Sequence, residues 1–298
     1  MSIICAVDFS EHSVEAVAVA SALAASLHEP LSLVHALEPF GWVTQLPHVQ
    51  APMLKAIHEM LGKEVDGLRK IGVAVQAELL RGVPDEAIVA HAKALNARLV
   101  VVSALGYRSH GWGIGSVADR IAQTTPVPAL IVRQPEVFQA WTRKDRALRV
   151  LVAADFTATS DAAIHWVGQL RQLAPIDVLV THVYRQLEEG QRRGIKGPME
   201  VEPINPETER ALTHDLAARV GELPGEGSLQ FQIRAGRDLT ADQLVQLAEE
   251  TRADLVVVGT HQRSGLGRWW YGSVSQGVLH TASMNVACVP VIAAGETE

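Results

Sequence analysis

Residues 5–9 read Cys-Ala-Val-Asp-Phe, and residues 152–156 read Val-Ala-Ala-Asp-Phe. The two segments are offset by 147 positions, and His35 recurs as His182 at the same offset. An internal repeat of this length indicates a duplicated domain rather than a solenoid, whose units recur every few dozen residues. Each half of the chain can therefore be compared with the other.

Later landmarks of the repeat drift, because loops of different length separate them. Gly82 corresponds to Gly236 at an offset of 154, and Gly115 corresponds to Gly272 at an offset of 157. A chain of 298 residues is long enough for two domains that each bury a core. The basic and proline-containing stretch that begins near Pro135 predicts a linker. We expect a first domain at residues 1–134, a linker at 135–146 and a second domain at 147–298.

The composition is that of a soluble globular protein, with 48% hydrophobic and 20% charged residues. A formal charge of -7 gives no general attraction to nucleic acid or to an anionic membrane. The start of the sequence has no basic region typical of a signal peptide, and the apolar stretch at 14–27 is too short to span a bilayer. Cys5 and Cys288 stand alone in apolar runs, which suits reduced thiols. We expect a cytoplasmic protein without a nucleic-acid or membrane partner.

Runs rich in Val, Ile and Leu alternate with amphipathic segments, which predicts two tandem doubly wound α/β domains. Each domain should hold a five-stranded parallel sheet with helices on both faces. Strands are expected near 2–7, 31–37, 73–79, 98–102 and 128–132, then near 148–153, 176–183, 229–234, 254–258 and 286–293. Helices are expected near 13–28, 51–71, 84–95 and 116–124, then near 159–174, 206–222, 240–252 and 273–283. Ligands bind such sheets beyond the carboxyl ends of strands, where the strand order reverses.

A glycine-rich loop follows the fourth strand of the second half, and a helix is expected to open at Ser273. Glycines allow close backbone approach, and a helix N-terminus presents free N–H groups, so the loop is a candidate anion site. Asp8 and Asp155 either cap N–H groups of the following turn or contact a ligand. His35 and His182 are more typical of hydrogen-bonded core histidines than of catalytic bases.

These landmarks resemble the universal stress protein family in its tandem two-domain form. The resemblance covers almost the whole chain and includes the aspartate that ends strand one, the histidine that ends strand two, and the loop of spaced glycines followed by Gly-Ser. In the nucleotide-binding branch of that family the loop reads Gly, two residues, Gly, nine residues, Gly, then Ser or Thr, and it holds the phosphates of ATP. The strand-one aspartate and the residue after the strand-two histidine lie against the adenosine.

The resemblance assigns a nucleotide site to each half. In the second half it comprises Asp155, Val183, Gly259, Gly272, Ser273 and Val274. In the first half it comprises Asp8, Ala36, Gly106, Gly115, Ser116 and Val117. The second half departs from the motif at Gln262, which replaces the second glycine, and the first half departs at Ser103, which replaces the first glycine. The first-half loop is also one residue shorter, so the sequence alone favours the second-half site.

Three functions remain open at this stage. The first is a stress-response protein that binds ATP, with Mg²⁺, in the second domain and thereby changes its association with a protein partner. The second is an interaction protein that retains the fold without a ligand, because both loops depart from the motif. The third is an enzyme. It would be at most a slow ATPase, because the sequence contains no Walker lysine, catalytic triad or metal motif. The resemblance also implies an internal pseudo-dimer of the two domains or a homodimer of chains.

Overall fold

The computed structural model describes residues 1–38, 46–106, 113–185, 204–236, 239–260 and 273–291. The chain divides into two compact units, one comprising Met1–Asp145 and the other beginning at Arg146. Each unit is an α/β domain with its own parallel sheet, so the predicted fold class is confirmed. None of the helices within these residues has the length and hydropathy needed to cross a bilayer.

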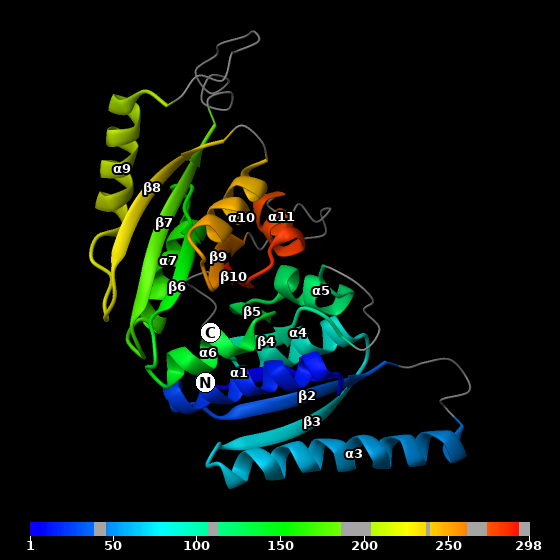
Figure 1. Cartoon of the computed structure of the whole chain (residues 1–298). Coiled ribbons are helices and arrows are strands. Elements are labelled where there is room, and N and C mark those ends of the chain that lie inside the picture. The colour runs from blue at the N-terminus through cyan, green and yellow to red at the C-terminus, as the bar shows by residue number, and fades with distance from the viewer. Residues whose placement is uncertain (39–45, 107–112, 186–203, 237–238, 261–272, 292–298) are drawn as a thin grey trace, which may run out of the picture. The chain divides into compact units, whose positions relative to one another are not determined.

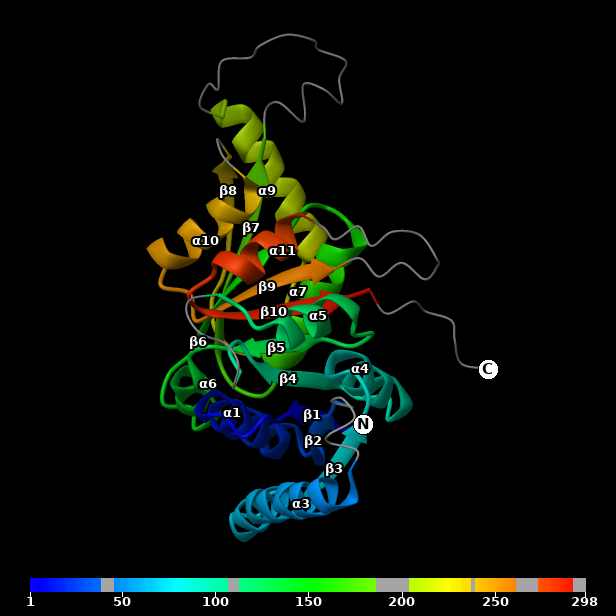
Figure 2. The same cartoon turned by 90° about the vertical axis from the view of Figure 1, so that its right-hand side faces the viewer.

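The sheet of the first unit has the strand order β3-β2-β1-β4-β5, and every recorded pairing is parallel. Its strands are β1 (Ile3–Ala6), β2 (Leu31–Leu37), β3 (Val75–Arg81), β4 (Leu99–Ser103) and β5 (Ala129–Val132). Its helices are α1 (Glu11–Leu27), α3 (Pro47–Lys70), α4 (Pro84–Ala94), α5 (Ser116–Thr124) and α6 (Pro135–Thr142). Right-handed crossovers put α1 and α3 on one face of the sheet and α4 and α5 on the other. The contacts of α4 with α5 agree with this arrangement, and α3 lies along β3 (Figure 1, Figure 2).

The sheet of the second unit has the matching order β10-β9-β6-β7-β8, again with parallel pairings. Its strands are β6 (Leu148–Ala153), β7 (Ile176–Tyr184), β8 (Leu229–Ala235), β9 (Leu255–Thr260) and β10 (Asn285–Pro290). Its helices are α7 (Ala158–Leu170), α9 (Pro206–Val220), α10 (Thr240–Glu250) and α11 (Ser273–Thr281). In both units the order reverses between the first and fourth strands, where a ligand site is expected.

The segment at 135–146, expected from the sequence to be a linker, contains the helix α6. Pro135 opens it, and Val137, Phe138 and Trp141 are buried. The helix packs on α1, so it is part of the first unit. Spacings of three and four residues align these side chains on one face, but a helix of 8 residues is too short to give a clear periodic signal.

Candidate functional site

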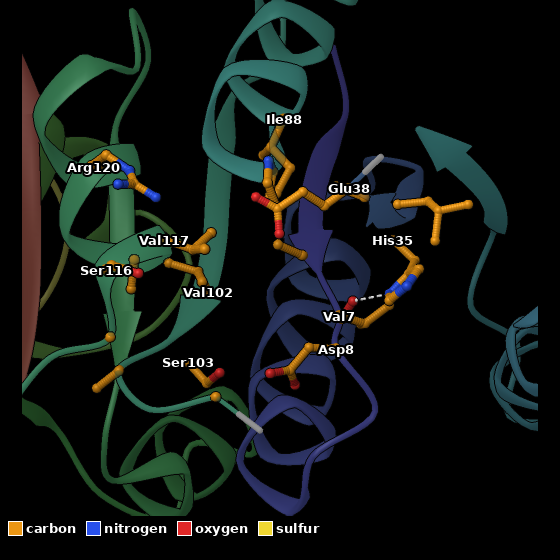
Figure 3. Close-up of a pocket in the computed structure, with 18 residues that line it drawn as sticks. Val7, Asp8, His35, Glu38, Ile88, Val102, Ser103, Ser116, Val117 and Arg120 are labelled. Atoms are coloured by element: carbon orange, nitrogen blue, oxygen red, sulfur yellow. Dashed lines mark hydrogen bonds between the residues drawn. The ribbon is translucent and has the colours of Figure 1, made fainter. Parts of the chain in front are cut away.

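A cavity of about 410 Å³ lies in the first unit at the carboxyl ends of β1, β2 and β4, against the start of α5. Figure 3 shows strand-end residues on one side of it and residues of α5 on the other. The cavity is lined by all six residues that the family resemblance assigns to the first half: Asp8, Ala36, Gly106, Gly115, Ser116 and Val117. Residues far apart in the sequence therefore meet at the predicted switch point of the sheet.

Asp8 organises the turn that leaves β1. Its Oδ1 accepts hydrogen bonds from the backbone N–H and the hydroxyl of Ser10, at 3.1 and 2.6 Å. Ser10 in turn caps α1, because its hydroxyl accepts from the N–H of Ser13. Between them Phe9 has a φ of 62°, a left-handed conformation that costs free energy in a residue other than glycine. Asp8 thus fixes the turn with one oxygen while it also lines the cavity.

His35 holds the end of β2 against this turn. Its Nδ1 lies 2.8 Å from the carbonyl oxygen of Val7, and its ring centroid lies 4.8 Å from that of Phe9 (Figure 3). A carbonyl can only accept, so Nδ1 carries a proton and donates it. The expectation of a hydrogen-bonded structural histidine is confirmed.

The chain after β4 approaches Asp8 closely. A Cβ atom at Gly106 would lie 2.5 Å from Oδ2 of Asp8, a separation that real Cβ atoms do not show. Ser103, by contrast, is buried and lines the cavity with its side chain. A larger residue at the second position of this loop would therefore have to displace the Asp8 carboxylate, whereas the first position accommodates serine.

The N-terminus of α5 faces the cavity. Gly115 is its N-cap and provides no side-chain acceptor, so the first N–H groups of the helix have no internal partner. Such a terminus favours an anion. Arg120, one turn further along α5, is the only Lys or Arg among the described residues that line the cavity, and Asp8 and Glu38 bring carboxylates to the opposite side (Figure 3).

The second unit repeats the turn after its first strand. Oδ1 of Asp155 accepts from the N–H of Thr157 at 3.1 Å, and Phe156 has a φ of 61°. His182 donates from Nδ1 to the carbonyl of Ala154 at 2.8 Å. Asp155 is exposed, whereas Asp8 is half-buried. The β1–β2 side of the site is therefore built in the same way twice.

The β9 side of the second unit differs from its counterpart in the first. A Cβ atom at Gly259 would lie only 2.3 Å from the carbonyl oxygen of Thr159, at the start of α7. Packing of the strand on α7 therefore requires this glycine. Val183 lies at the end of β7 beside Gly236. Ser273 and Val274 open α11, and Gly272 and Gln262 lie outside the described residues.

The cysteines and the metal-binding residue types offer no further chemistry. Burial raises the pKa of the Cys5 thiol, with a smaller contribution from the charge of Glu64, so this thiol is a poor nucleophile. Within the described ranges, His, Cys, Asp and Glu form no group of three that could hold a metal ion.

Several lining residues were not singled out from the sequence, among them Glu38, Pro84, Ile88 and Arg120. Arg120 follows Ser116 by four positions, so both lie on one face of α5. That spacing is a signal which could have identified Arg120 from the sequence. Pro84 and Ile88 reach the cavity because α4 packs beside α5, which is a tertiary contact without a local signature.

Comparisons with known proteins agree with this architecture. The model of the Universal stress protein family matches residues 1–133 and again residues 147–290. Universal stress protein Rv2623 of Mycobacterium tuberculosis is 28% identical over 280 residues, which cover 90% of this chain and 87% of that protein. A universal stress protein of Mycolicibacterium smegmatis is 26% identical, with 96% of each chain covered. The crystal structure of a universal stress protein from Archaeoglobus fulgidus has a TM-score of 0.71 at 16% identity, covering 97% of this chain and 98% of that one.

Proposed function

Both halves of this chain belong to the universal stress protein family, and we propose that the cavity of the first domain binds an adenine nucleotide. The proposed ligand is ATP with Mg²⁺, and its proposed effect is to change the association of the chain with a protein partner in a cytoplasmic stress response. One observation carries the proposal: the six first-half residues that the family resemblance assigns to nucleotide binding line one cavity.

The two sides of the cavity suit different parts of a nucleotide. Asp8 and Glu38 offer carboxylate oxygens, which accept hydrogen bonds from an amino group or from ribose hydroxyls. The N-terminus of α5 offers N–H groups and the positive end of a helix dipole, which favour phosphate. The apolar residues Ile88, Val102 and Val117 lie between them and suit a flat base (Figure 3). A volume of about 410 Å³ also lies in the usual range for small-molecule sites.

The residues of the second domain remain a second proposed nucleotide site, although sequence alone favoured it over the first. A loop that followed the first-domain path would bring Gln262 to the position of Gly106. There a Cβ atom meets the strand-one carboxylate. Asp155 has the same turn as Asp8, so a glutamine on that path would have to displace the Asp155 carboxylate. The first domain is therefore the stronger proposal.

Calorimetric titration with ATP and Mg²⁺ tests the proposal when two matched variants are compared. Gly115→Glu places a carboxylate at the N-terminus of α5, and Gly272→Glu makes the same change in the second domain. We expect saturable binding by the wild type that Gly115→Glu abolishes and Gly272→Glu preserves. The reverse pattern would assign the site to the second domain.

Absence of heat and of any thermal shift at millimolar ATP would favour the alternative, an interaction protein that uses the fold without a ligand. Light scattering with and without ATP then tests whether the nucleotide changes the association of the chain. A nucleotide-dependent change in mass is expected if the ligand controls formation of a homodimer. A mass that is unchanged by ATP would assign the effect to a different protein partner.

A further inference from the structure

We infer that Arg120 binds the phosphate of the cavity's ligand and that Asp85 positions its guanidinium. This inference rests on the proposed function, because it names the residue pair that recognises one part of the nucleotide. It also explains why the first domain carries a charged pair between α4 and α5 where the second domain has two small residues.

The guanidinium of Arg120 lies at the carboxyl edge of the sheet. Nε of Arg120 is 3.0 Å from Oδ1 of Asp85, and Asp85 is in the first turn of α4. Both α4 and α5 begin at this edge, since each follows a strand of a parallel sheet. Side chains on a helix tilt toward its N-terminus, so Arg120 extends toward the turn that begins at Ser116. Its positive charge therefore adds to that of the helix terminus.

Asp85 is a buried carboxylate whose one recorded charged partner in the described part of the chain is Arg120. Its side chain is 9% exposed, and within the described residues its Oδ1 has no hydrogen-bond partner of good geometry. The ion pair with Arg120 compensates this charge, and loss of the partner would leave it buried and unpaired. Asp85 therefore holds the arginine in place.

Arg120 retains hydrogen-bond donors for a ligand while it is paired with Asp85. A guanidinium has N–H groups on Nε and on both Nη atoms, arranged as a planar fork that matches phosphate. Only the contact from Nε to Asp85 is recorded for this side chain among the described residues, and the side chain is half exposed. The Nη groups can thus donate to phosphate without breaking the ion pair.

The second domain has no space for such a pair. Gly277 stands at the position of Arg120, five residues after the glycine that precedes each helix. Ala241 stands at the position of Asp85, three residues before a buried apolar residue of the preceding helix. A Cβ atom at Gly277 would lie 2.4 Å from Cβ of Ala241, so α10 and α11 are in close contact at this point. An arginine that can select for phosphate at this helix position is therefore a feature of the first domain.

The test compares Arg120→Gln with Arg98→Gln in the full chain. Arg98 is a matched control because it pairs with Glu29 at 3.5 Å and lies at the opposite, amino-terminal edge of the same sheet. Each protein is titrated with ATP, adenosine and inorganic tripolyphosphate. Arg120→Gln should raise the Kd for ATP roughly 10- to 100-fold, remove tripolyphosphate binding and leave the Kd for adenosine within about twofold. Arg98→Gln should change none of them.

Asp85→Asn separates the positioning role from the binding role. It keeps the charge of Arg120 but weakens its anchor, so the loss of affinity should be smaller than in Arg120→Gln and confined to the phosphorylated ligands. Equal weakening of ATP and adenosine in either variant would mean a purely structural role and would overturn the inference. Unchanged ATP affinity in Arg120→Gln would also overturn it.

The three probes distinguish failure of this inference from failure of the proposed function. Tripolyphosphate binding that depends on Arg120, without binding of adenosine or ATP, would retain the anion site and reject the nucleotide. Binding of ATP and adenosine with equal affinity by the wild type would retain a nucleoside site and reject the role of Arg120. No binding of any probe by the wild type would reject both.

Discussion

The two domains agree on one side of the candidate site and differ on the other. Both have a strand-one aspartate that fixes a turn, followed by a phenylalanine at positive φ, and both have a histidine bonded to a strand-one carbonyl at 2.8 Å. They differ in sequence after the fourth strand, where the first domain has Gly106 against Asp8 and the second has Gln262. They also differ between the helices that precede and follow this strand, where only the first domain has an arginine. The shared part fixes the same turn in either domain, and in our proposal the part that differs makes the first domain the stronger nucleotide site.

A first way to sharpen the comparison is to change the amino-terminal edge, where the domains differ most in charge. Asp254 is buried and accepts hydrogen bonds from Arg146, at 2.7 Å, and from Arg149. We expect Asp254→Ala to lower the free energy of unfolding of the second domain by about 2–4 kcal/mol, because two arginines lose their partner. Hydrogen exchange resolved by peptide measures each domain separately. Arg98→Ala, in the half-buried but longer pair of the first domain, should cost no more than about 1 kcal/mol, and equal losses would contradict the comparison.

The same carboxylate predicts a pH dependence. Burial alone would raise the pKa of Asp254, but the hydrogen bonds from Arg146 and Arg149 outweigh burial and lower it. A lowered pKa in the folded state means that the contribution to stability is complete above the ordinary aspartate pKa, near 3.9, and is lost as the pH falls through the lowered value. Acid titration of the wild type and of Asp254→Asn should therefore converge in stability only below about pH 4. A constant difference at all pH values would refute this role.

Exchanging glycine and serine at the first glycine position of the loop motif tests whether the two domains differ in packing there. Gly259→Ser would bring a Cβ atom against the carbonyl of Thr159, so we expect a loss of about 1–3 kcal/mol from the second domain. Ser103→Gly in the first domain adds only backbone flexibility and should lower the free energy of unfolding by about 0.5–1 kcal/mol. Urea unfolding of both variants measures these values. A harmless Gly259→Ser would show that α7 can move away from β9.

Exchanging the residues at the second glycine position tests the site itself. Gly106→Gln places the second-domain residue against Asp8, and we expect the affinity for ATP to fall about 10- to 100-fold. Gln262→Gly makes the reverse change in the second domain. Calorimetry on both variants gives affinity and stoichiometry. Full affinity for ATP in Gly106→Gln would contradict the proposed difference between the two domains in nucleotide binding.

The smallest effects are expected for the shared part. His35→Phe and His182→Phe each remove one hydrogen bond to a strand-one carbonyl, which should cost about 1 kcal/mol of unfolding free energy in the respective domain. Because the ring contact with phenylalanine is retained, similar values are expected for both. Peptide-resolved hydrogen exchange checks them, and a change of ATP affinity in His35→Phe without loss of stability would assign this histidine to the ligand instead.

The sequence predicted the fold well because the strands are short apolar runs and the helices between them have clear periodicity. The duplication helped, since Asp8 and Asp155 marked the same turn twice. The helix α6 was not predicted, because its 8 residues give little periodic signal and the helix is stabilised by burial of Phe138 and Trp141 against α1. Boundaries of the other elements were expected within a few residues of those observed.

The candidate site was predicted only in part. The family resemblance assigned six first-domain residues that line the cavity, but it marked Ser103 as a departure from the motif where the structure accommodates a buried serine. The pairing of Arg120 with Asp85 was missed because it joins two helices, and no spacing within one helix reveals a partner on another. The close approach of Gly106 to Asp8 is likewise a tertiary contact that the spacing of the motif does not reveal.

The most direct measurement is photoaffinity labelling of the full chain with an azido derivative of ATP, followed by mapping of the labelled peptides. If the first domain holds the nucleotide, the label should fall on peptides from the ends of β1 and β2 or from α5, and excess ATP should prevent it. Labelling confined to peptides that follow Arg146 would contradict the account and return the site to the second domain.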